Sequence, residues 1–270
     1  MLSREMRQAI RPSLFTRPEA YVPGRSNARD LLDRRRKRSD LLNRFDARCY
    51  TAPHSPVVKL NVLQKIVDPG LVAVIRASSA DLAARVAHAC VEGGIRALEV
   101  TFTVPNAATA IADLSARYPA AEVVVGAGTV LDAETARIAI LAGARFVVSP
   151  ASDAATARVC RRYQVPYLPG AATPGEVVRA LEDGADIVKV FPGEGLGPGF
   201  VRAVRGPLPH APLMPTGGVS VETAEDWIRA GCVALGVGGA LTKAAETGHF
   251  ADVTEKAGLL IAAIRRARGA

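Results

Sequence analysis

The chain is poor in lysine: of its 34 basic residues, six are lysines and 28 are arginines. Aromatic residues make up only 5% of the sequence, and no apolar run reaches the roughly 20 residues that a membrane-spanning helix needs. The first residues do not show the basic-then-apolar pattern of a secretory signal. These absences predict a cytoplasmic protein with no membrane partner.

Cysteine and histidine are also scarce, with four of each, and they are scattered along the chain. The cysteines are Cys49, Cys90, Cys160 and Cys232, and the histidines are His54, His88, His210 and His249. No CxxC pair or histidine motif occurs, so we interpret the cysteines as small buried apolar residues rather than disulfide partners or zinc ligands. The sequence predicts no metal site.

The formal net charge of +8 is concentrated in the first 56 residues. This segment holds thirteen basic and six acidic residues, whereas residues 57–270 hold 21 and 20. The basic run Arg34-Arg35-Arg36-Lys37-Arg38 and several prolines predict a flexible extension with one short helix near residues 28–44. A start codon placed too far upstream would produce the same pattern. Arginines can also neutralise phosphates, which leaves nucleic-acid binding as the less favoured alternative.

From residue 57 onward, short apolar runs alternate with amphipathic stretches. A helical pattern over 57–67 comes first, and eight runs with the length and the Val, Ile and Leu content of buried strands follow. The predicted strands are 71–77, 97–102, 123–129, 146–150, 166–170, 187–191, 212–218 and 234–239. The predicted helices between them include 80–92, 106–117, 133–142, 154–162, 174–182 and 221–230. This alternation predicts one α/β domain over 57–270, a single (β/α)8 TIM barrel with an N-terminal closing helix.

Capping residues support these boundaries. The predicted N-caps are Asp132, Asp153, Thr173 and Ser220, and the glycines that end helices are Gly93, Gly94, Gly143, Gly184 and Gly231. The competing architecture is a doubly wound sheet, which usually carries a GxGxxG turn after its first strand. Here the first strand runs into Ser78-Ser79-Ala80 instead, so the barrel is favoured.

A charged residue stands inside each of two predicted strands. Lys189 lies in the middle of the run 187–191, and Glu99 lies between Leu98 and Val100. An unpaired charge is costly to bury, so a lysine there tends to lose its proton or to lie near a carboxylate. A deprotonated lysine can form a Schiff base with a carbonyl carbon, and a carboxylate can move the protons that the reaction requires. The alternative is an edge strand on which Lys189 faces water.

Further polar and small residues stand within or just after the predicted strands, at the end where barrels build their active sites. They are Arg76, Thr103, Thr129, Pro150, Gly170, Thr216, Gly217, Gly218, Gly238 and Gly239. Backbone N–H groups of the two glycine pairs could bind a phosphate, as the last two loops of barrels often do. The alternative is that these glycines only allow tight turns from strand to helix.

Six short motifs stand on successive predicted strands. They are Leu98-Glu99-Val100-Thr101, Gly126-Ala127-Gly128-Thr129-Val130, Ser149-Pro150, Leu168-Pro169-Gly170, Val188-Lys189-Val190-Phe191-Pro192 and Pro215-Thr216-Gly217-Gly218. In order and spacing they resemble the 2-keto-3-deoxy-6-phosphogluconate (KDPG) aldolases, and the resemblance covers residues 57–265. It implies a metal-independent class I aldolase of the Entner-Doudoroff pathway, a lyase without a cofactor. Such enzymes often also cleave 4-hydroxy-2-oxoglutarate (KHG), and they are typically homotrimers.

The resemblance also implies a role for each candidate residue. Lys189 would form the Schiff base with the keto carbon, and Glu99 would be the general acid and base, acting through a water. Thr129 and the Pro169-Gly170 turn would line the pyruvate end, Phe191 would pack beside the lysine, and Thr216, Gly217, Gly218 and Gly238 would bind the phosphate. Pro150 is a further expected substrate contact. The products would be pyruvate and glyceraldehyde 3-phosphate.

Two positions depart from the family pattern. Thr103 stands where many members have an arginine that binds the substrate carboxylate, and we expect Arg76 to replace that arginine from the first strand. Gly239 stands where members often have a serine, so one hydroxyl donor to the phosphate is missing. A non-phosphorylated 2-keto acid therefore remains a candidate substrate.

Other functions stay open on the sequence alone. Contacts to hydroxyl groups decide between KDPG, its phosphogalactonate epimer and KHG, and the sequence does not reveal them. A different class of protein would be a non-catalytic phosphate-binding barrel with a nucleic-acid-binding tail. An unused buried ion pair usually confers no more stability than apolar residues would, so Glu99 and Lys189 together argue against this class.

Overall fold

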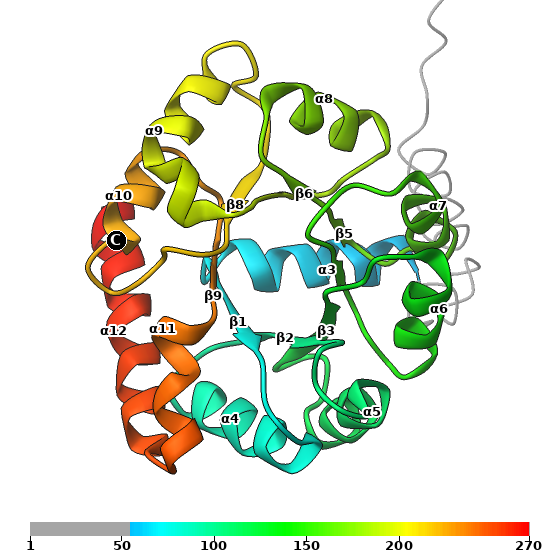
Figure 1. Cartoon of the computed structure of the whole chain (residues 1–270), viewed down its shortest axis with the longest axis vertical. Helices are drawn as coiled ribbons and strands as arrows, with labels where there is room; N and C mark the ends of the chain where they lie inside the picture. Colours follow the sequence, from blue (N-terminus) through cyan, green and yellow to red (C-terminus); the bar gives the residue numbers. More distant parts are fainter. Residues whose placement is uncertain (1–54, 270) are drawn as a thin grey trace, which may run out of the picture. The chain divides into compact units, whose positions relative to one another are not determined.

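The computed structural model describes residues 55–269, in which parallel strands alternate with helices that surround them (Figure 1). By its contacts the chain divides into residues 1–47 and 48–270, and all described residues belong to the second unit. The helix expected near residues 28–44, Cys49 and His54 lie outside the described residues. Within residues 55–269 no helix is both long and apolar enough to cross a membrane.

Nine short strands and ten α-helices make up the described unit. The strands are β1 (Leu71–Ile75), β2 (Ala97–Thr101), β3 (Val124–Gly128), β4 (Val147–Val148), β5 (Tyr167–Leu168), β6 (Gly170–Ala171), β7 (Val188–Val190), β8 (Leu213–Pro215) and β9 (Leu235–Val237). The helices are α3 (Pro56–Val67), α4 (Ala80–Glu92), α5 (Ala107–Arg117), α6 (Ala133–Leu141), α7 (Ala154–Arg162), α8 (Pro174–Glu182), α9 (Gly193–Arg205), α10 (Ala224–Arg229), α11 (Gly239–Thr242) and α12 (Phe250–Arg268), with a 3-10 helix η2 (Lys243–Thr247).

The strands form two curled parallel sheets. One has the order β5-β4-β3-β2-β1-β9 and the other β6-β7-β8. A parallel bridge between Thr216 and Gly236 connects the end of β8 to β9. At the other junction, the N–H groups of Asp186 and Lys189 donate to the carbonyls of Tyr167 (3.0 Å) and Pro169 (2.8 Å). Backbone hydrogen bonds therefore link the sheets on both sides.

Two sequence predictions about local structure are wrong. The run 166–170 is two strands, β5 and β6, with Pro169 between them; proline has no N–H to give to a ladder. Ser220 is not an N-cap, because α10 begins at Ala224 and Thr223 precedes it. The N–H of Ser220 donates instead to Oγ1 of Thr223 at 2.9 Å.

The other predicted caps are confirmed. Asp132, Asp153 and Thr173 each accept a backbone N–H of their helix through the side chain. Gly143, Gly184 and Gly231 follow helix ends with φ of +105°, +86° and +105°, a conformation that favours glycine.

The free cysteines Cys90, Cys160 and Cys232 are buried, and burial raises their thiol pKa to about 12. They behave as apolar residues.

Side chains of the strands alternate between two buried clusters. The larger cluster lies between the sheets and the surrounding helices. The smaller, inner cluster consists of Val62, Ile66, Val72, Ala97, Val124, Phe146, Val148, Leu168, Ile187, Met214 and Ala234. Because Val62 and Ile66 belong to α3, this helix packs against the inner face of the sheets, and Figure 1 shows it passing behind them. An ion pair of 2.8 Å between Lys59 and Asp186 joins α3 to the segment before β7.

Candidate active site

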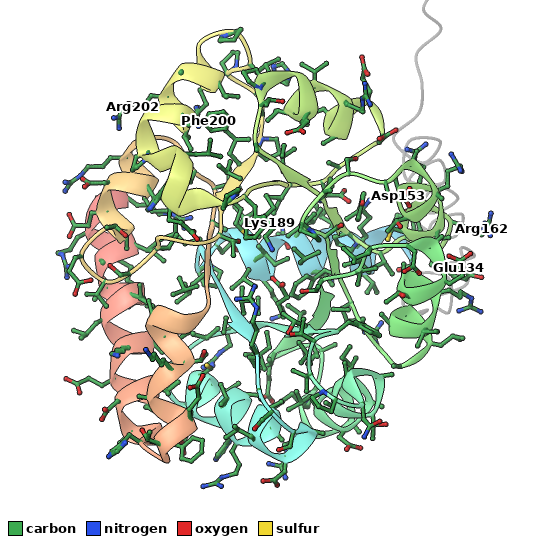
Figure 2. The ribbon with its side chains drawn as sticks, in the orientation of Figure 1. Glu134, Asp153, Arg162, Lys189, Phe200 and Arg202 are labelled. Carbon is green, nitrogen blue, oxygen red and sulfur yellow. The ribbon has the colours of Figure 1, made fainter. Side chains whose placement is uncertain are left out.

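Lys189 and Glu99 continue the inner face of their strands. On β7, Lys189 stands two residues after Ile187, and on β2, Glu99 stands two residues after Ala97; both of these neighbours belong to the inner cluster. Because side chains alternate along a strand, both charges point inward. Lys189 is 3% exposed and Glu99 is fully buried, so the lysine does not face water. Figure 2 shows Lys189 amid the strands, far from the helices at the rim.

The Glu99 carboxyl is the most strongly desolvated acid of the site. Burial raises its pKa above the usual 4.5, while the positive charges of Lys189 and Arg76 oppose that rise. Neither carboxylate oxygen has a hydrogen-bond partner among residues 55–269. A desolvated carboxyl with a raised pKa holds its proton at higher pH than an exposed one, which suits a group that must both give and take protons.

Two glycines of β3 make room for inward side chains. A methyl group built on Gly128 would come 1.9 Å from Oε1 of Glu99. One built on Gly126 would come 2.5 Å from the Phe146 ring. Any side chain at these positions would displace its neighbour. Packing against these two side chains therefore explains why the Gly126-Ala127-Gly128 motif has glycine at both ends.

The surroundings of Lys189 bring three further candidate residues together. The Nζ of Lys189 lies 5.0 Å from the centroid of the Phe191 ring. Lys189 pairs with Gly170 of β6 in the sheet register. A methyl group on Gly170 would come 1.9 Å from the carbonyl oxygen of Pro150. Pro150, Gly170 and Phe191 thus lie on the same side of the site as the lysine, as the sequence predicts.

Two candidate threonines follow β2 and β3. The hydroxyls of Thr103 and Thr101 are 2.7 Å apart, and Thr101 donates to the carbonyl of Ile75 at 3.1 Å, directly before Arg76. This chain of contacts ties Thr103 to the end of β1. Thr129 has φ of +56°, a conformation that is strained for a β-branched residue. Backbone strain of this kind often marks functional sites.

A cavity of about 490 Å³ follows the ends of β1, β7, β8 and β9. It is lined by Arg76, Phe191, Glu194, Thr216, Gly217, Gly218, Val219, Ser220, Gly238, Gly239 and Ala240. Oγ1 of Thr216 is buried without a partner among residues 55–269, and a methyl group on Gly236 would come 2.4 Å from it. A methyl group on Gly238 would come 3.4 Å from Nη1 of Arg76. The guanidinium therefore lies beside the glycine loop after β9.

Seven candidate residues line this cavity. The other six lie on, or within two residues after, the strands β2, β3, β4, β6 and β7. Sequence reasoning missed Glu194, the second residue of α9. An acidic residue in a first helical turn is common because it interacts favourably with the helix dipole, so nothing marked it as a site residue.

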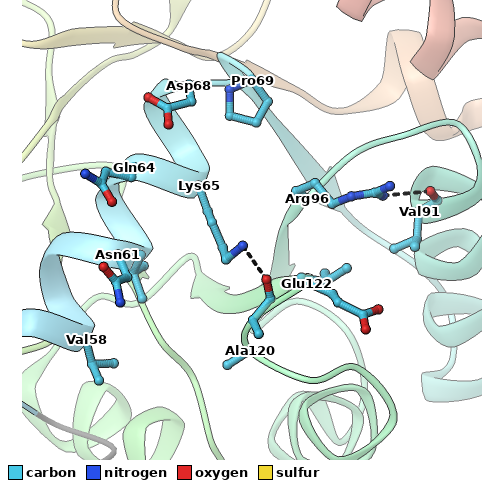
Figure 3. A pocket seen from close by; sticks show the side chains of 13 residues that line it. Val58, Asn61, Gln64, Lys65, Asp68, Pro69, Val91, Arg96, Ala120 and Glu122 are labelled. Atoms are coloured by element: carbon cyan, nitrogen blue, oxygen red, sulfur yellow. Dashed lines mark hydrogen bonds between the residues drawn. The ribbon is translucent and has the colours of Figure 1, made fainter. Parts of the chain in front are cut away.

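A larger cavity of about 860 Å³ lies at the opposite end of the strands (Figure 3). Its lining includes Asp68 and Pro69 before β1 and Val123 before β3, and none of the candidate residues. The side chain of Lys65 donates to the carbonyl of Ala121, and Arg96 donates to the carbonyls of Val91 and Ile95 at 3.0 Å each. Its cations are thus engaged by main-chain carbonyls, and the larger cavity lacks the inward Lys–Glu combination.

The family model of KDPG and KHG aldolases matches residues 62–256. The chain belongs to this family. The 2-dehydro-3-deoxy-phosphogluconate aldolase of Treponema pallidum is 38% identical over 188 residues, which cover 68% of this chain and 88% of the relative. The 2-dehydro-3-deoxy-6-phosphogalactonate aldolase of Escherichia coli is 31% identical over 66% of this chain and 86% of the relative.

A solved structure of a KDPG and KHG aldolase family member shares both fold and sequence. It is the KDPG aldolase of Legionella pneumophila, with pyruvate captured at low pH as a covalent carbinolamine intermediate. It aligns with a TM-score of 0.67 and 27% identity over 74% of this chain and 96% of the other. Family membership explains why the six motifs occur together.

Proposed function

We propose that this chain is a class I aldolase that cleaves KDPG to pyruvate and glyceraldehyde 3-phosphate, with KHG as a second substrate. The observation that carries the proposal is the pair of inward-pointing, buried side chains of Lys189 and Glu99. The positive charge of Lys189 interacts with the Glu99 carboxyl and lowers its pKa. Family membership and the pyruvate carbinolamine of the Legionella pneumophila relative support it. We assign the site to the domain formed by residues 57–270.

In the proposed mechanism, Nζ of Lys189 attacks the C2 carbonyl carbon of the substrate and forms a carbinolamine. Glu99, acting through a water, supplies the proton with which the hydroxyl leaves, and an iminium forms. Glu99 then removes the proton of the C4 hydroxyl, the C3–C4 bond breaks, and its electron pair moves into the iminium to give an enamine. Protonation of the enamine and hydrolysis release pyruvate and restore the lysine.

We assign the substrate carboxylate to Arg76 in place of the arginine that Thr103 replaces. The contacts from Thr103 through Thr101 to Ile75 support this assignment, because they bring the Thr103 position to the end of β1. Thr129, Pro150, Gly170 and Phe191 would surround the pyruvate portion. A guanidinium can bind a carboxylate through two parallel hydrogen bonds, which a threonine cannot.

We assign the phosphate to the cavity of about 490 Å³. Thr216, Gly217, Gly218, Gly238 and Gly239 would contact it. The unpartnered Oγ1 of Thr216 supports this assignment, because a buried hydroxyl without a partner gains stability from a ligand that supplies one. Nothing lies within 4 Å of the position of a Cβ added at Gly239, and as a glycine it offers the phosphate only its backbone N–H.

Two architectural proposals accompany this function. We propose that the two sheets act as one closed (β/α)8 barrel with α3 as its closing helix, which the hydrogen bonds at both sheet junctions support.

We also propose a homotrimer. Leu131, Ile138 and Leu141 on and beside α6 are 61%, 51% and 69% exposed, which would suit an interface. Light scattering should then give three times the chain mass of 28.3 kDa.

Borohydride trapping tests the function directly. The protein is incubated with pyruvate, reduced, digested and analysed by mass spectrometry. A pyruvate adduct on Lys189, absent from Lys189→Met, is expected; an adduct elsewhere or no adduct would contradict the mechanism. Turnover of KDPG, its phosphogalactonate epimer and KHG under identical conditions then ranks the substrates, and we expect KDPG to have the highest kcat/KM.

A further inference from the structure

An acidic side chain lies against the proposed phosphate loop. A methyl group on Gly217 would come 1.9 Å from Oε2 of Glu194, and one on Gly218 would come 2.8 Å from its Cα. The φ values of the two glycines, +92° and +67°, keep the turn in a conformation that other residues rarely adopt. The glutamate thus packs on the very turn whose N–H groups we assign to the phosphate.

The lining of this cavity is electrically balanced rather than positive. Among the residues that line it, Arg76 is the only cationic side chain and Glu194 the only anionic one. Glu194 is exposed, and no other side chain within residues 55–269 donates to its carboxylate or forms an ion pair with it. A phosphate dianion that enters therefore meets, besides the single guanidinium of Arg76, a carboxylate that no side chain within residues 55–269 pairs with.

We propose that Glu194 is a specificity-determining residue that weakens the binding of a phosphate dianion and thereby lets keto acids that end in a hydroxyl compete with phosphorylated ones. This inference rests on the proposed function, since it concerns the distal end of a substrate held at Lys189. Like charges repel, and a dianion has no proton to donate to the carboxylate. A terminal hydroxyl is neutral and can donate a hydrogen bond to Glu194.

A matched control separates the effect of the charge in the cavity from the effect of a charge at a helix N-terminus. Glu194 is the second residue of α9, where a negative charge also stabilises the helix N-terminus. Glu134 is the second residue of α6, is likewise exposed, and lies at the outer edge of the molecule (Figure 2). Glu134→Gln therefore removes the same charge from the same helical position without touching the cavity. Glu194→Gln keeps the shape of the side chain against Gly217.

The first readout is substrate selectivity. The ratio of kcat/KM for KDPG to kcat/KM for 2-keto-3-deoxygluconate is measured for the wild type, Glu194→Gln and Glu134→Gln. We expect Glu194→Gln to raise the ratio about tenfold through a lower KM for KDPG, and Glu134→Gln to leave it within about twofold. An unchanged or lower ratio in Glu194→Gln overturns the inference.

The second readout needs no turnover. A ligand that binds the native state raises the melting temperature according to its concentration over its Kd. Inorganic phosphate should therefore stabilise Glu194→Gln more than the wild type or Glu134→Gln at equal concentration. Equal shifts in all three proteins overturn the inference. Loss of the Lys189 adduct in the wild type would instead contradict the proposed function, so the two failures are distinguishable.

Discussion

The carboxylate of Glu99 lies directly over the Cα of Gly128: a methyl group built there would come 1.9 Å from Oε1 and 2.6 Å from the carboxyl carbon. The two residues are diagonal neighbours across the β2–β3 ladder, in which Glu99 pairs with Gly126 and Thr101 with Gly128. The absence of a side chain at Gly128 therefore sets where the buried acid of the site can lie.

Gly128→Ala should strongly reduce activity without unfolding the protein. Its φ is not in the left-handed region, so alanine is compatible with the backbone, and the new methyl group can only be accommodated if Glu99 moves. A misplacement of about 1 Å in a catalytic group can reduce rates roughly 100-fold. We expect a loss of kcat/KM of that order, measured by coupled assay of pyruvate release.

Gly175→Ala is the matched control for this change. Gly175 lies in the first turn of α8 and has nothing within 4 Å of the position of an added Cβ. Activity should stay within about twofold, and stability should stay equal or rise slightly, because alanine favours helix over glycine. Full activity in Gly128→Ala would show that Glu99 is not held in place by this glycine.

The sequence patterns predicted the elements better than the fine geometry of the site. Apolar runs bounded by glycine and N-cap residues define buried strands and helices locally, which is why 80–92, 154–162 and 174–182 match α4, α7 and α8 in full. A charge inside an apolar strand is a local anomaly, which is why Lys189 and Glu99 could be found.

Other features depend on partners that are distant in sequence. The requirement for glycine at 126 and 128 follows from strand pairing on both sides of β3, with Glu99 on β2 and Phe146 directly before β4. No local pattern in the sequence contains these pairings. The interruption at Pro169 becomes visible only once β7 is known as the pairing partner. Glu194 escaped notice because its place in a first helical turn already had an ordinary explanation.

Glu99→Gln should make the protein more stable at neutral pH while abolishing turnover. Burial raises the native pKa of Glu99 above its usual 4.5, so between that value and the native pKa the folded protein binds more protons than the unfolded one. Wild-type stability therefore falls as pH rises through this window, by about 1.4 kcal/mol for each unit of pKa shift. Glutamine does not titrate, so the stability of Glu99→Gln relative to the wild type should increase from pH 4.5 upward.

Denaturant unfolding at a series of pH values checks whether wild-type stability falls, relative to Glu99→Gln, as pH rises. Because the positive charge of Lys189 lowers the Glu99 pKa, the same comparison in a Lys189→Met background should show a larger advantage for glutamine. A stability difference between the wild type and Glu99→Gln that stays constant with pH would contradict the raised pKa.

Arg76→Gln should weaken substrate binding and shift the pH profile of the aldolase. A charge-assisted hydrogen bond contributes about 1.5–3 kcal/mol, so KM for KDPG and KHG should rise roughly 10- to 100-fold. Because Arg76 lowers the pKa of Glu99, its loss should also move the limb of kcat/KM governed by Glu99 to higher pH. Steady-state kinetics across pH measure both effects.

Arg202→Gln provides the comparison, because Arg202 is an exposed arginine of α9 at the outer edge of the molecule (Figure 2). It should change neither KM nor the pH profile. An unchanged KM in Arg76→Gln for substrates that carry the pyruvate portion would show that another group binds the carboxylate.

Arg268→Ala should destabilise the fold and leave catalysis unchanged. The Arg268 guanidinium donates to the carbonyls of Val67 (3.0 Å), Asp68 (2.6 Å) and Val233 (2.8 Å), which joins the end of α12 to the end of α3 and to the segment before β9. These bonds lie at the opposite end of the strands from Lys189. Their loss should lower the free energy of unfolding by about 1–3 kcal/mol, or roughly 2–4 °C in Tm for each kcal/mol.

Arg265→Ala is the control, because it removes an exposed arginine from the same last turns of α12. It should change Tm by no more than about 1 °C. An equal loss of stability in both variants would assign the effect to the charge near the helix C-terminus rather than to the bonds with the three carbonyls.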